Sequence, residues 1–134
     1  MKDLSAFDTA IADARAFVRD KQRGDWHSVA CVVQTASGRQ FIGMNLDSTL
    51  PRASVCAEPV ALGMAMAQDP DDRVVFCAAV NRRGEVIPPC GPCRELMLDY
   101  AADAQIAVPD GEGHAVVHMS ALMPTPFKPT QRKP

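Results

Sequence analysis

The sequence predicts an α/β protein in which helices cover both faces of a mixed five-stranded sheet, as a three-layer α/β/α sandwich. Two observations lead to this prediction. Some segments repeat apolar residues at helical spacing, others are short β-branched runs, and the two kinds follow one another in the order α-β-β-α-β-α-β-β. The 134 residues suit a single domain, and no linker or internal repeat divides residues 1–134.

The first half of the chain predicts a helix, a hairpin and a second helix. Residues 4–23 carry apolar side chains at steps of three and four, namely Leu4, Phe7, Ile11, Ala14 and Val18. Residues 28–35 and 40–44 are separated by the turn pair Ser-Gly, which indicates two antiparallel strands. Residues 55–68 are dense in Ala, Leu and Met, as expected of a largely buried helix.

The second half predicts a buried strand, a short helix and a last pair of strands. Residues 73–80 form a continuous apolar run, which is typical of a strand covered on both faces. A helix is expected from residue 90 or 91 to residue 100, followed by strands at 105–109 and 114–119. Residues 124–134 contain four of the eleven prolines, so we expect an irregular C-terminal tail.

Charge and hydropathy exclude several classes of partner. The formal net charge is −2 and the pI is about 5.8, which argues against a polynucleotide because phosphate binding needs clustered Lys and Arg. Apolar stretches end well short of the ~20 residues of a membrane span, and the first ten residues lack the apolar core of a signal peptide. We therefore expect a cytoplasmic protein with a small-molecule substrate and no membrane partner.

Two cysteine motifs carry the chemistry. Cys56-Ala57-Glu58 and the run Pro-Cys-Gly-Pro-Cys at 89–93 both lie where a helix is expected to start. Free amides and the helix dipole favour thiolates at such positions. Cys56, Cys90 and Cys93 would meet if the two helix starts lie side by side. Three protein ligands leave the fourth position of a zinc ion open for water, as in catalytic zinc sites.

The Cys-x-x-Cys motif and the whole zinc site both have alternative interpretations. A Cys-x-x-C motif alone indicates a structural zinc knuckle or a redox pair more often than a catalytic site. Glu58, two residues after the first ligand, favours catalysis because a nonligand carboxylate beside the metal can transfer protons. A noncatalytic zinc-stabilised binding protein is the alternative from another class. Cys31 and Cys77 lie in apolar strands and are expected to be small core residues.

Nearly the whole chain resembles the small cytidine deaminases that assemble as homotetramers, and their relative blasticidin-S deaminase. The matching segments are SGRQFIGMN (37–45), CAEPVALGMA (56–65), PPCGPCRELMLDY (88–100) and ALMPTPF (121–127). The resemblance implies a cytidine deaminase-like fold and one Zn²⁺ per subunit. It also implies hydrolytic deamination of a small cytosine-type nucleoside, cytidine or deoxycytidine, to the uracil form with release of ammonia, as in pyrimidine salvage.

The same resemblance assigns individual residues. It makes Cys56, Cys90 and Cys93 the zinc ligands and Glu58 the residue that passes protons to the ring nitrogen and the leaving ammonia. The backbone around Ala57 and Pro89 is expected to bind the pyrimidine. Residues expected to contact the rest of the substrate are Asn45, Asp47, His27 and, from a neighbouring subunit, Phe127. The implied assembly is a homotetramer in which neighbouring subunits complete the active sites.

Three positions depart from the cytidine deaminase pattern. Asp47 stands where the family has a Glu that is one methylene longer, and His27 replaces a Phe that stacks on the base. Pro59 replaces an Arg that offsets the surplus charge of three thiolates on one Zn²⁺. Blasticidin-S deaminase also lacks that Arg. These departures keep a second substrate hypothesis open, a blasticidin-like antibiotic or another amino-substituted heterocycle.

Overall fold

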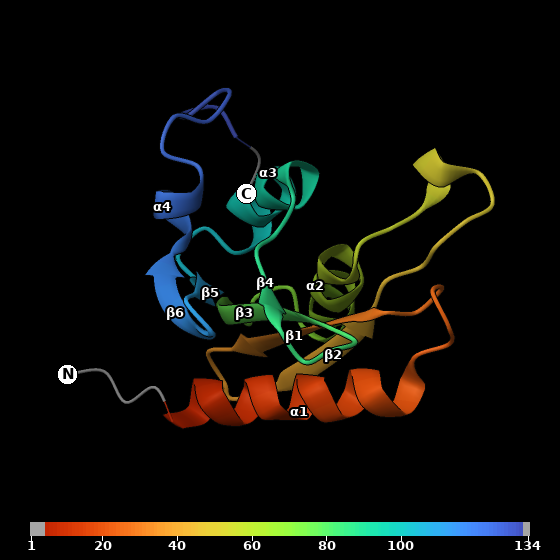
Figure 1. The fold of residues 1–134 in the computed structure, drawn as a ribbon. Coiled ribbons are helices and arrows are strands. Elements are labelled where there is room, and N and C mark those ends of the chain that lie inside the picture. Colours follow the sequence, from red (N-terminus) through yellow and green to blue (C-terminus); the bar gives the residue numbers. More distant parts are fainter. Residues whose placement is uncertain (1–4, 133–134) are drawn as a thin grey trace.

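A six-stranded mixed sheet forms the centre of the protein (Figure 1). The structure is a computed structural model that describes residues 5–132. The strand order is β2-β1-β3-β5-β6, and β4 pairs with β3 off this path. The strands are β1 (Val29–Thr35), β2 (Gln40–Met44), β3 (Val74–Asn81), β4 (Val86–Ile87), β5 (Gln105–Asp110) and β6 (Gly113–His118). All pairs are antiparallel except β3 and β5, which run parallel.

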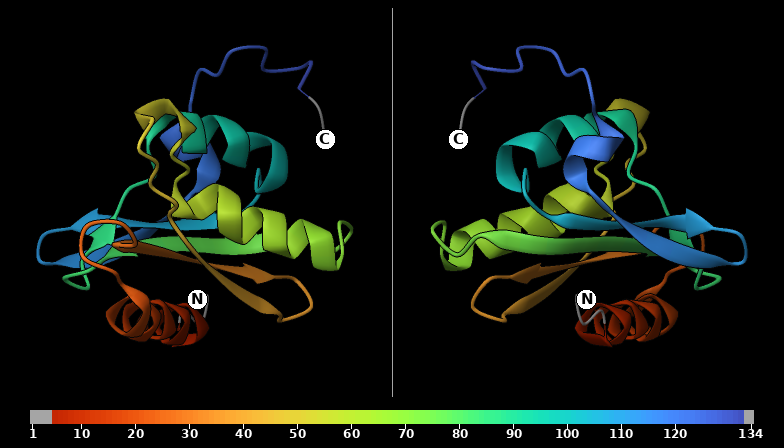
Figure 2. Two further views of the ribbon diagram at one scale, coloured as in Figure 1. Left: turned by 90° about the vertical axis from the view of Figure 1, so that its right-hand side faces the viewer. Right: turned by 90° about the vertical axis from the view of Figure 1, so that its left-hand side faces the viewer.

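Helices cover both faces of this sheet. Helix α1 (Ser5–Lys21) lies on one face, and α2 (Ala57–Gln68), α3 (Gly91–Tyr100) and the short α4 (Met119–Leu122) lie on the other (Figure 2). This arrangement confirms the predicted three-layer α/β/α sandwich. The predicted first helix ends two residues early, at Lys21, and Leu4 lies outside the described residues.

The predicted number of five strands was one too few. Strand β4 has only two residues and gives no periodic signal, so the sequence did not reveal it. It forms because residues 81–85 fold back on β3. The side-chain oxygen of Asn81 accepts the backbone N–H groups of Arg83 and Glu85, each at 3.0 Å. This turn leads the chain through β4 to the Pro88-Pro89 segment that precedes Cys90.

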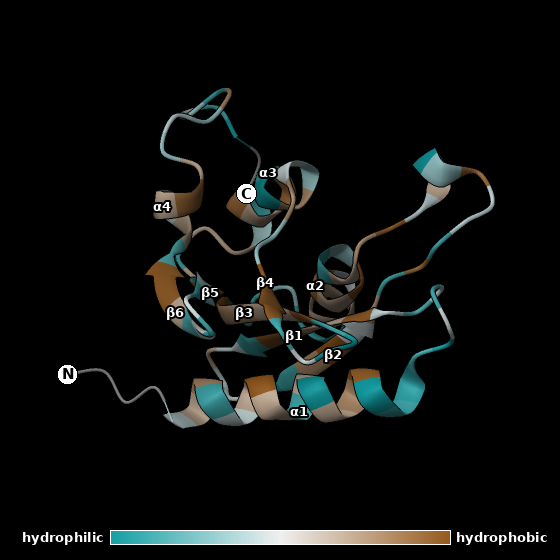
Figure 3. Cartoon of the chain, in the orientation of Figure 1, coloured by the Kyte–Doolittle hydropathy of each residue, from teal (hydrophilic) through white to brown (hydrophobic). Residues whose placement is uncertain are grey.

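Each face of the sheet has its own hydrophobic core. The apolar side of α1 faces the sheet (Figure 3), where the ring of Phe7 stacks on that of Phe76 with centroids 4.1 Å apart. The other core lies beneath α2 and α3 and includes both Cys31 and Cys77. Their sulfur atoms lie 3.4 Å apart and are almost completely buried. The prediction that these two cysteines are core residues is confirmed.

A close approach at Gly43 fixes the position of α2. A Cβ atom on Gly43 would lie 2.7 Å from the backbone nitrogen of Ala61 and 2.9 Å from a methyl group of Val60. Real Cβ contacts are not this short, so β2 and α2 can lie at this spacing only because residue 43 has no side chain. Gly43 therefore determines how closely α2 packs on the sheet, and with it the positions of Cys56 and Glu58 at the start of this helix.

Two segments extend from the sandwich. Residues 46–55 form an arm that projects away from the sheet (Figure 1) and is closed by paired backbone hydrogen bonds between Leu46 and Val55. Residues 123–132 contain no helix or strand and run past α3. No helix within residues 5–132 is both long and apolar enough to cross a membrane.

Candidate active site

The sulfur atoms of Cys56, Cys90 and Cys93 meet between the starts of α2 and α3. All three lie within 4.8 Å of one another, and those of Cys56 and Cys90 are 3.6 Å apart. Cys56 is the N-cap residue of α2, and Cys90 is the N-cap residue of α3. Neither side chain caps its helix, so both thiols are free to face the shared space. Strand β3 and the turn after it bring the two helix starts together across 34 residues of sequence.

This geometry fits a zinc ion. Two sulfur ligands of a tetrahedral zinc, each about 2.3 Å from the metal, lie about 3.8 Å apart. The 3.6 Å between Cys56 and Cys90 matches this separation closely. Thiolates are soft ligands that select zinc, copper(I) or iron–sulfur clusters over hard cations. Among the described residues, these three are the one group of Cys, His or acidic side chains close enough to hold a metal.

The surroundings shift the pKa values of the Cys93 and Cys90 thiols in opposite directions. Burial raises the pKa of the Cys93 thiol well above its ordinary value, and the nearby carboxylate of Glu58 adds to this effect. For Cys90 burial acts in the same direction, but hydrogen bonds from the Cys93 backbone and from neighbouring thiols lower its pKa overall. Zinc binds the thiolate form, so metal binding here must release protons. The N-terminal ends of α2 and α3 supply partial positive charge to the thiolates.

Glu58 is a buried carboxylate beside these thiols. It lies in the first turn of α2, and only 5% of its surface is exposed. Burial raises its pKa, while hydrogen bonds from its own backbone N–H and from the Cys93 thiol act in the opposite direction. A carboxyl group with a raised pKa can both accept and return a proton near neutral pH. The position therefore suits a proton-transfer residue.

A pocket of about 220 Å³ opens next to Glu58. This volume is below the roughly 300–1,000 Å³ of pockets for drug-sized ligands, which indicates a small molecule. The lining residues come from four stretches of the sequence and are Val29, Asn45, Asp47, Ser54, Val55, Cys56, Ala57, Glu58, Ile87, Pro88 and Cys90. Within the described part of the chain, no basic or aromatic side chain lines this pocket. Its only charged groups besides the thiols are two carboxylates.

Asn45 lines the pocket but uses its side chain within the protein. Its oxygen accepts the backbone N–H groups of Ser28 and Val29, each at 3.0 Å. Its side-chain nitrogen lies 3.4 Å from the carbonyl oxygen of Trp26 and 3.3 Å from a carboxylate oxygen of Asp47. Asn45 thus fixes the start of β1 and orients Asp47. The bonds to Trp26, Ser28 and Val29 could not be predicted from the sequence, because these partners lie 16 to 19 residues away.

The structure does not bring His27 or Phe127 into the same pocket. The Nδ1 atom of His27 lies 3.0 Å from the carbonyl oxygen of Asn45, and His27 borders a separate hollow with Arg23 and Trp26. Phe127 lies in the C-terminal tail with 75% of its surface exposed. Contacts of either residue with substrate therefore remain predictions.

Arg94, which the sequence offers together with Arg52 as a cation that could offset the thiolate charge, uses its side chain to bond two backbone carbonyl groups. Its Nε atom donates to the carbonyl oxygen of Pro89 at 2.8 Å, and Nη1 donates to that of Leu122 at 3.2 Å. Arg94 thereby ties the segment before Cys90 to the end of α4. A carbonyl oxygen has two lone pairs, so the Pro89 backbone can still accept a second hydrogen bond.

Comparison with known proteins places this chain in a family. No family model matches the chain. Blasticidin-S deaminase of Bacillus cereus is 32% identical over 114 residues, which cover 80% of this chain and 79% of the relative. Cytidine deaminase of Mycobacterium tuberculosis is 29% identical over 73 residues, 54% of each chain. This identity to named relatives makes the chain a deaminase, an enzyme of the hydrolase class. The chain belongs to the family of cytidine deaminases and blasticidin-S deaminase.

Solved structures agree with this assignment. The crystal structure of cytidine deaminase from Burkholderia pseudomallei has a TM-score of 0.75 and 25% identity, covering 90% of this chain and 98% of the other. That of cytidine deaminase from Mycobacterium leprae also has a TM-score of 0.75, with 24% identity and coverage of 89% and 98%. The cytidine deaminase-like fold expected from the sequence is confirmed.

Proposed function

We propose that this protein is a zinc-dependent aminohydrolase that converts a cytosine-type nucleoside, cytidine or deoxycytidine, to its uracil form and releases ammonia. The observation that carries the proposal is the buried carboxylate of Glu58 beside three convergent cysteine sulfurs at one end of a small pocket. Cys56, Cys90 and Cys93 would hold one Zn²⁺ per subunit. A zinc ion in such a site acts as a Lewis acid and makes hydroxide available near neutral pH.

Glu58 would then transfer the protons that deamination requires. Replacement of an exocyclic amine by oxygen needs one proton at the ring nitrogen and another at the departing nitrogen. The buried position of Glu58, with its raised pKa, allows one side chain to accept a proton from the attacking water and deliver it to the substrate. The backbone of Ala57, buried next to Glu58, would hold the heterocycle in place.

The charge of the pocket favours nucleosides over nucleotides. Asp47 and Glu58 place two carboxylates around the pocket, and no basic residue within the described chain lines it. A phosphate group would meet only negative charge there. A sugar hydroxyl, in contrast, can donate a hydrogen bond to Asp47, whose carboxylate Asn45 orients. We therefore expect cytidine and deoxycytidine to be better substrates than their monophosphates.

A blasticidin-like antibiotic is the second candidate substrate. The match to blasticidin-S deaminase is longer and more identical than the match to cytidine deaminase. The pocket also lacks an aromatic side chain from the described part of its own chain. In the proposed homotetramer, Phe127 of a neighbouring subunit would supply one.

A substrate panel separates these candidates. Zinc-loaded protein would be assayed by absorbance with cytidine, deoxycytidine, cytidine monophosphate and blasticidin S. The nucleoside proposal requires that the highest kcat/KM belongs to one of the two nucleosides. Efficient turnover of blasticidin S without turnover of either nucleoside would replace it by the second candidate. Absence of turnover on every compound would favour a noncatalytic zinc protein.

The variant Glu58→Gln tests the catalytic role directly. We expect kcat to fall by about 10²–10⁴-fold, because the amide cannot transfer protons. Zinc content by elemental analysis and the melting temperature should not decrease, because Gln fills the same volume and carries no buried charge. Glu112→Gln, in an exposed turn, is the matched control and should behave as wild type. Undiminished turnover by Glu58→Gln would refute the mechanism.

A further inference from the structure

The base of the arm at residues 46–55 forms part of the pocket wall. Leu46 and Val55 close the arm through two backbone hydrogen bonds of 2.8 Å each. Asp47, Ser54 and Val55 line the pocket. The outgoing and the returning segment of the arm therefore each bring one polar side chain to the pocket, namely Asp47 and Ser54.

Ser54 is hydrogen-bonded to the backbone next to Asp47. Its Oγ atom accepts the backbone N–H of Ser48 at 2.9 Å, and this N–H belongs to the peptide bond between Asp47 and Ser48. The backbone N–H of Ser54 donates to the carbonyl oxygen of Pro51 at 3.1 Å. The hydroxyl of Ser54 and the residue Asp47 are therefore neighbours at the pocket, held together by hydrogen bonds within the arm.

The hydroxyl of Ser54 can still donate a hydrogen bond. A serine hydroxyl has one proton to donate and two lone pairs that accept. The N–H of Ser48 uses one lone pair, and no group within residues 5–132 accepts the proton. Asn45 also lines the pocket, but its amide nitrogen is directed to Trp26 and Asp47. Ser54 is thus suited to donate to an uncharged ligand in the pocket.

Asp47 provides the complementary group. Its carboxylate accepts hydrogen bonds, and the side-chain nitrogen of Asn45 holds it from 3.3 Å away. An acceptor beside a donor matches two neighbouring hydroxyl groups, because one hydroxyl can donate to Asp47 while the other accepts from Ser54. Ribose carries such a pair on its 2′ and 3′ carbons, whereas 2′-deoxyribose has only one of the two.

We propose that Ser54 is a specificity-determining residue, which donates a hydrogen bond to one of the two vicinal hydroxyls of a ribonucleoside while Asp47 accepts from the other. The inference rests on the proposed function for the reaction at the base. It narrows the substrate from cytosine nucleosides in general to the ribonucleoside.

Three substrates test this assignment on zinc-loaded protein, namely cytidine, 2′-deoxycytidine and 3′-deoxycytidine. Wild type should have a kcat/KM for cytidine about 3–10-fold higher than for either analogue, which is the usual net effect of one hydrogen bond. Ser54→Ala should lose the preference over one analogue and keep it over the other. Asp47→Ala should show the opposite pattern. Each loss disappears on the analogue that already lacks the hydroxyl concerned.

Two further variants separate this role from support of the arm. Ser54→Thr keeps a hydroxyl on the same Cβ atom and should retain the preference of wild type. Ser48→Ala removes the hydroxyl that accepts the backbone N–H of Leu50, but it keeps the N–H that bonds Ser54. It should leave all three values of kcat/KM unchanged. If melting temperatures show that Ser54→Ala folds poorly, Ser54→Val replaces it, since Val and Thr have the same shape.

Three results would overturn the proposal. They are equal kcat/KM values of wild type for the three nucleosides, a uniform loss in Ser54→Ala, or the same analogue singled out by Ser54→Ala and Asp47→Ala. The last result would mean that Ser54 acts only by holding Asp47. Turnover of cytidine by wild type would leave the proposed function standing in each case. Absence of turnover on all three nucleosides would instead contradict the proposed function, and the role of Ser54 with it.

Discussion

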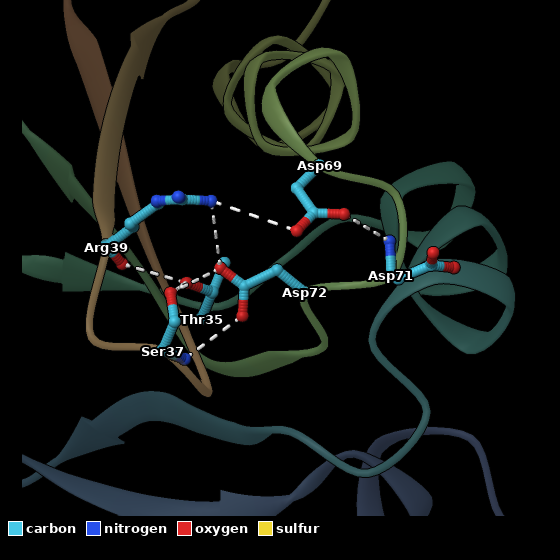
Figure 4. Close-up of polar contacts among 6 residues, drawn as sticks. All are labelled: Thr35, Ser37, Arg39, Asp69, Asp71 and Asp72. Carbon is cyan, nitrogen blue, oxygen red and sulfur yellow. Dashed lines mark hydrogen bonds and ion pairs between the residues drawn. The ribbon is translucent and has the colours of Figure 1, made fainter.

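The two ends of helix α2 use their polar groups in opposite ways. At the N-terminal end, Cys56 occupies the N-cap position but makes no capping hydrogen bond with its side chain, and it faces the pocket together with Glu58. At the C-terminal end, a network joins the loop after α2 to the β1–β2 turn (Figure 4). There Asp72 accepts the backbone N–H of Ser37 at 3.0 Å and its hydroxyl at 2.5 Å, and Arg39 lies 3.7 Å away.

This contrast shows which polar groups serve the fold and which serve a ligand. Asp72 and Glu58 are both mostly buried carboxylates, 9% and 5% exposed. Hydrogen bonds from the side chains of Ser37 and Thr35 hold the pKa of Asp72 below its ordinary value, whereas burial raises that of Glu58. Asp72 is therefore kept ionised by its own chain. Glu58 is left able to exchange a proton.

The largest effect is expected from removing a thiol of the cysteine cluster that lies beside the N-terminal end of α2. Cys90→Ala should abolish zinc binding and turnover, because two remaining cysteines do not complete the three-ligand site. Cys77→Ala is the matched control, since Cys77 is a core cysteine outside the cluster. Elemental analysis and the nucleoside assay measure both effects. Full zinc content in Cys90→Ala would show that the metal lies elsewhere in the protein.

A smaller effect is expected where Gly43 of β2 packs against the first half of α2. Gly43→Ala places a methyl group against the backbone of Ala61, so α2 must shift. We expect a loss of about 1–3 kcal/mol in the free energy of unfolding, measured by urea denaturation. The shift should also lower kcat/KM by moving Glu58. Gly63→Ala, on an open part of the same helix, should not destabilise the protein.

The smallest effect on stability is expected at Asp72, just after the C-terminal end of α2, and it depends on pH. The folded pKa of Asp72 is lowered, so its stabilising effect is present above the unfolded value of about 3.9 and is lost as pH falls through the folded pKa. Asp72→Asn should therefore be less stable than wild type at pH 7, and the difference should shrink below about pH 4. Urea denaturation at both pH values measures it.

The matched control for this prediction is the neighbouring residue. Asp71 is exposed, and its carboxylate takes no part in the network (Figure 4). Asp71→Asn should leave the stability unchanged at either pH. A pH-independent loss in Asp72→Asn would mean that the hydrogen bonds, and not the charge, carry the stabilisation. Unaltered kcat for Asp72→Asn would confirm that the two ends of α2 have separate roles.

Much of the fold could be predicted because its signals are local. The helical stripe around Ile11 and the apolar run before Asn81 each identify an element within a few residues. Strand β4 could not be predicted, because two residues are too few to show an alternation of apolar and polar side chains. Its pairing with β3 also depends on a turn that the Asn81 side chain holds. The contact between the tail and α3 could not be predicted either, because Arg132 and its partners Glu95 and Asp99 are more than 30 residues apart in the sequence.

The residue types of the proposed site could be predicted from their spacing alone. The spacing of Cys56, Glu58, Cys90 and Cys93 at two helix starts indicated a three-thiol site with a nearby acid, because these residue types at these positions suit few other purposes. Tertiary structure decided which side chains face the pocket. Asn45 proved to be bonded to the backbone of its own chain, and the tail that carries Phe127 proved to be tied to α3 through Arg132. Hydrogen bonds between distant segments form only when the sheet brings those segments together, and no local pattern records them.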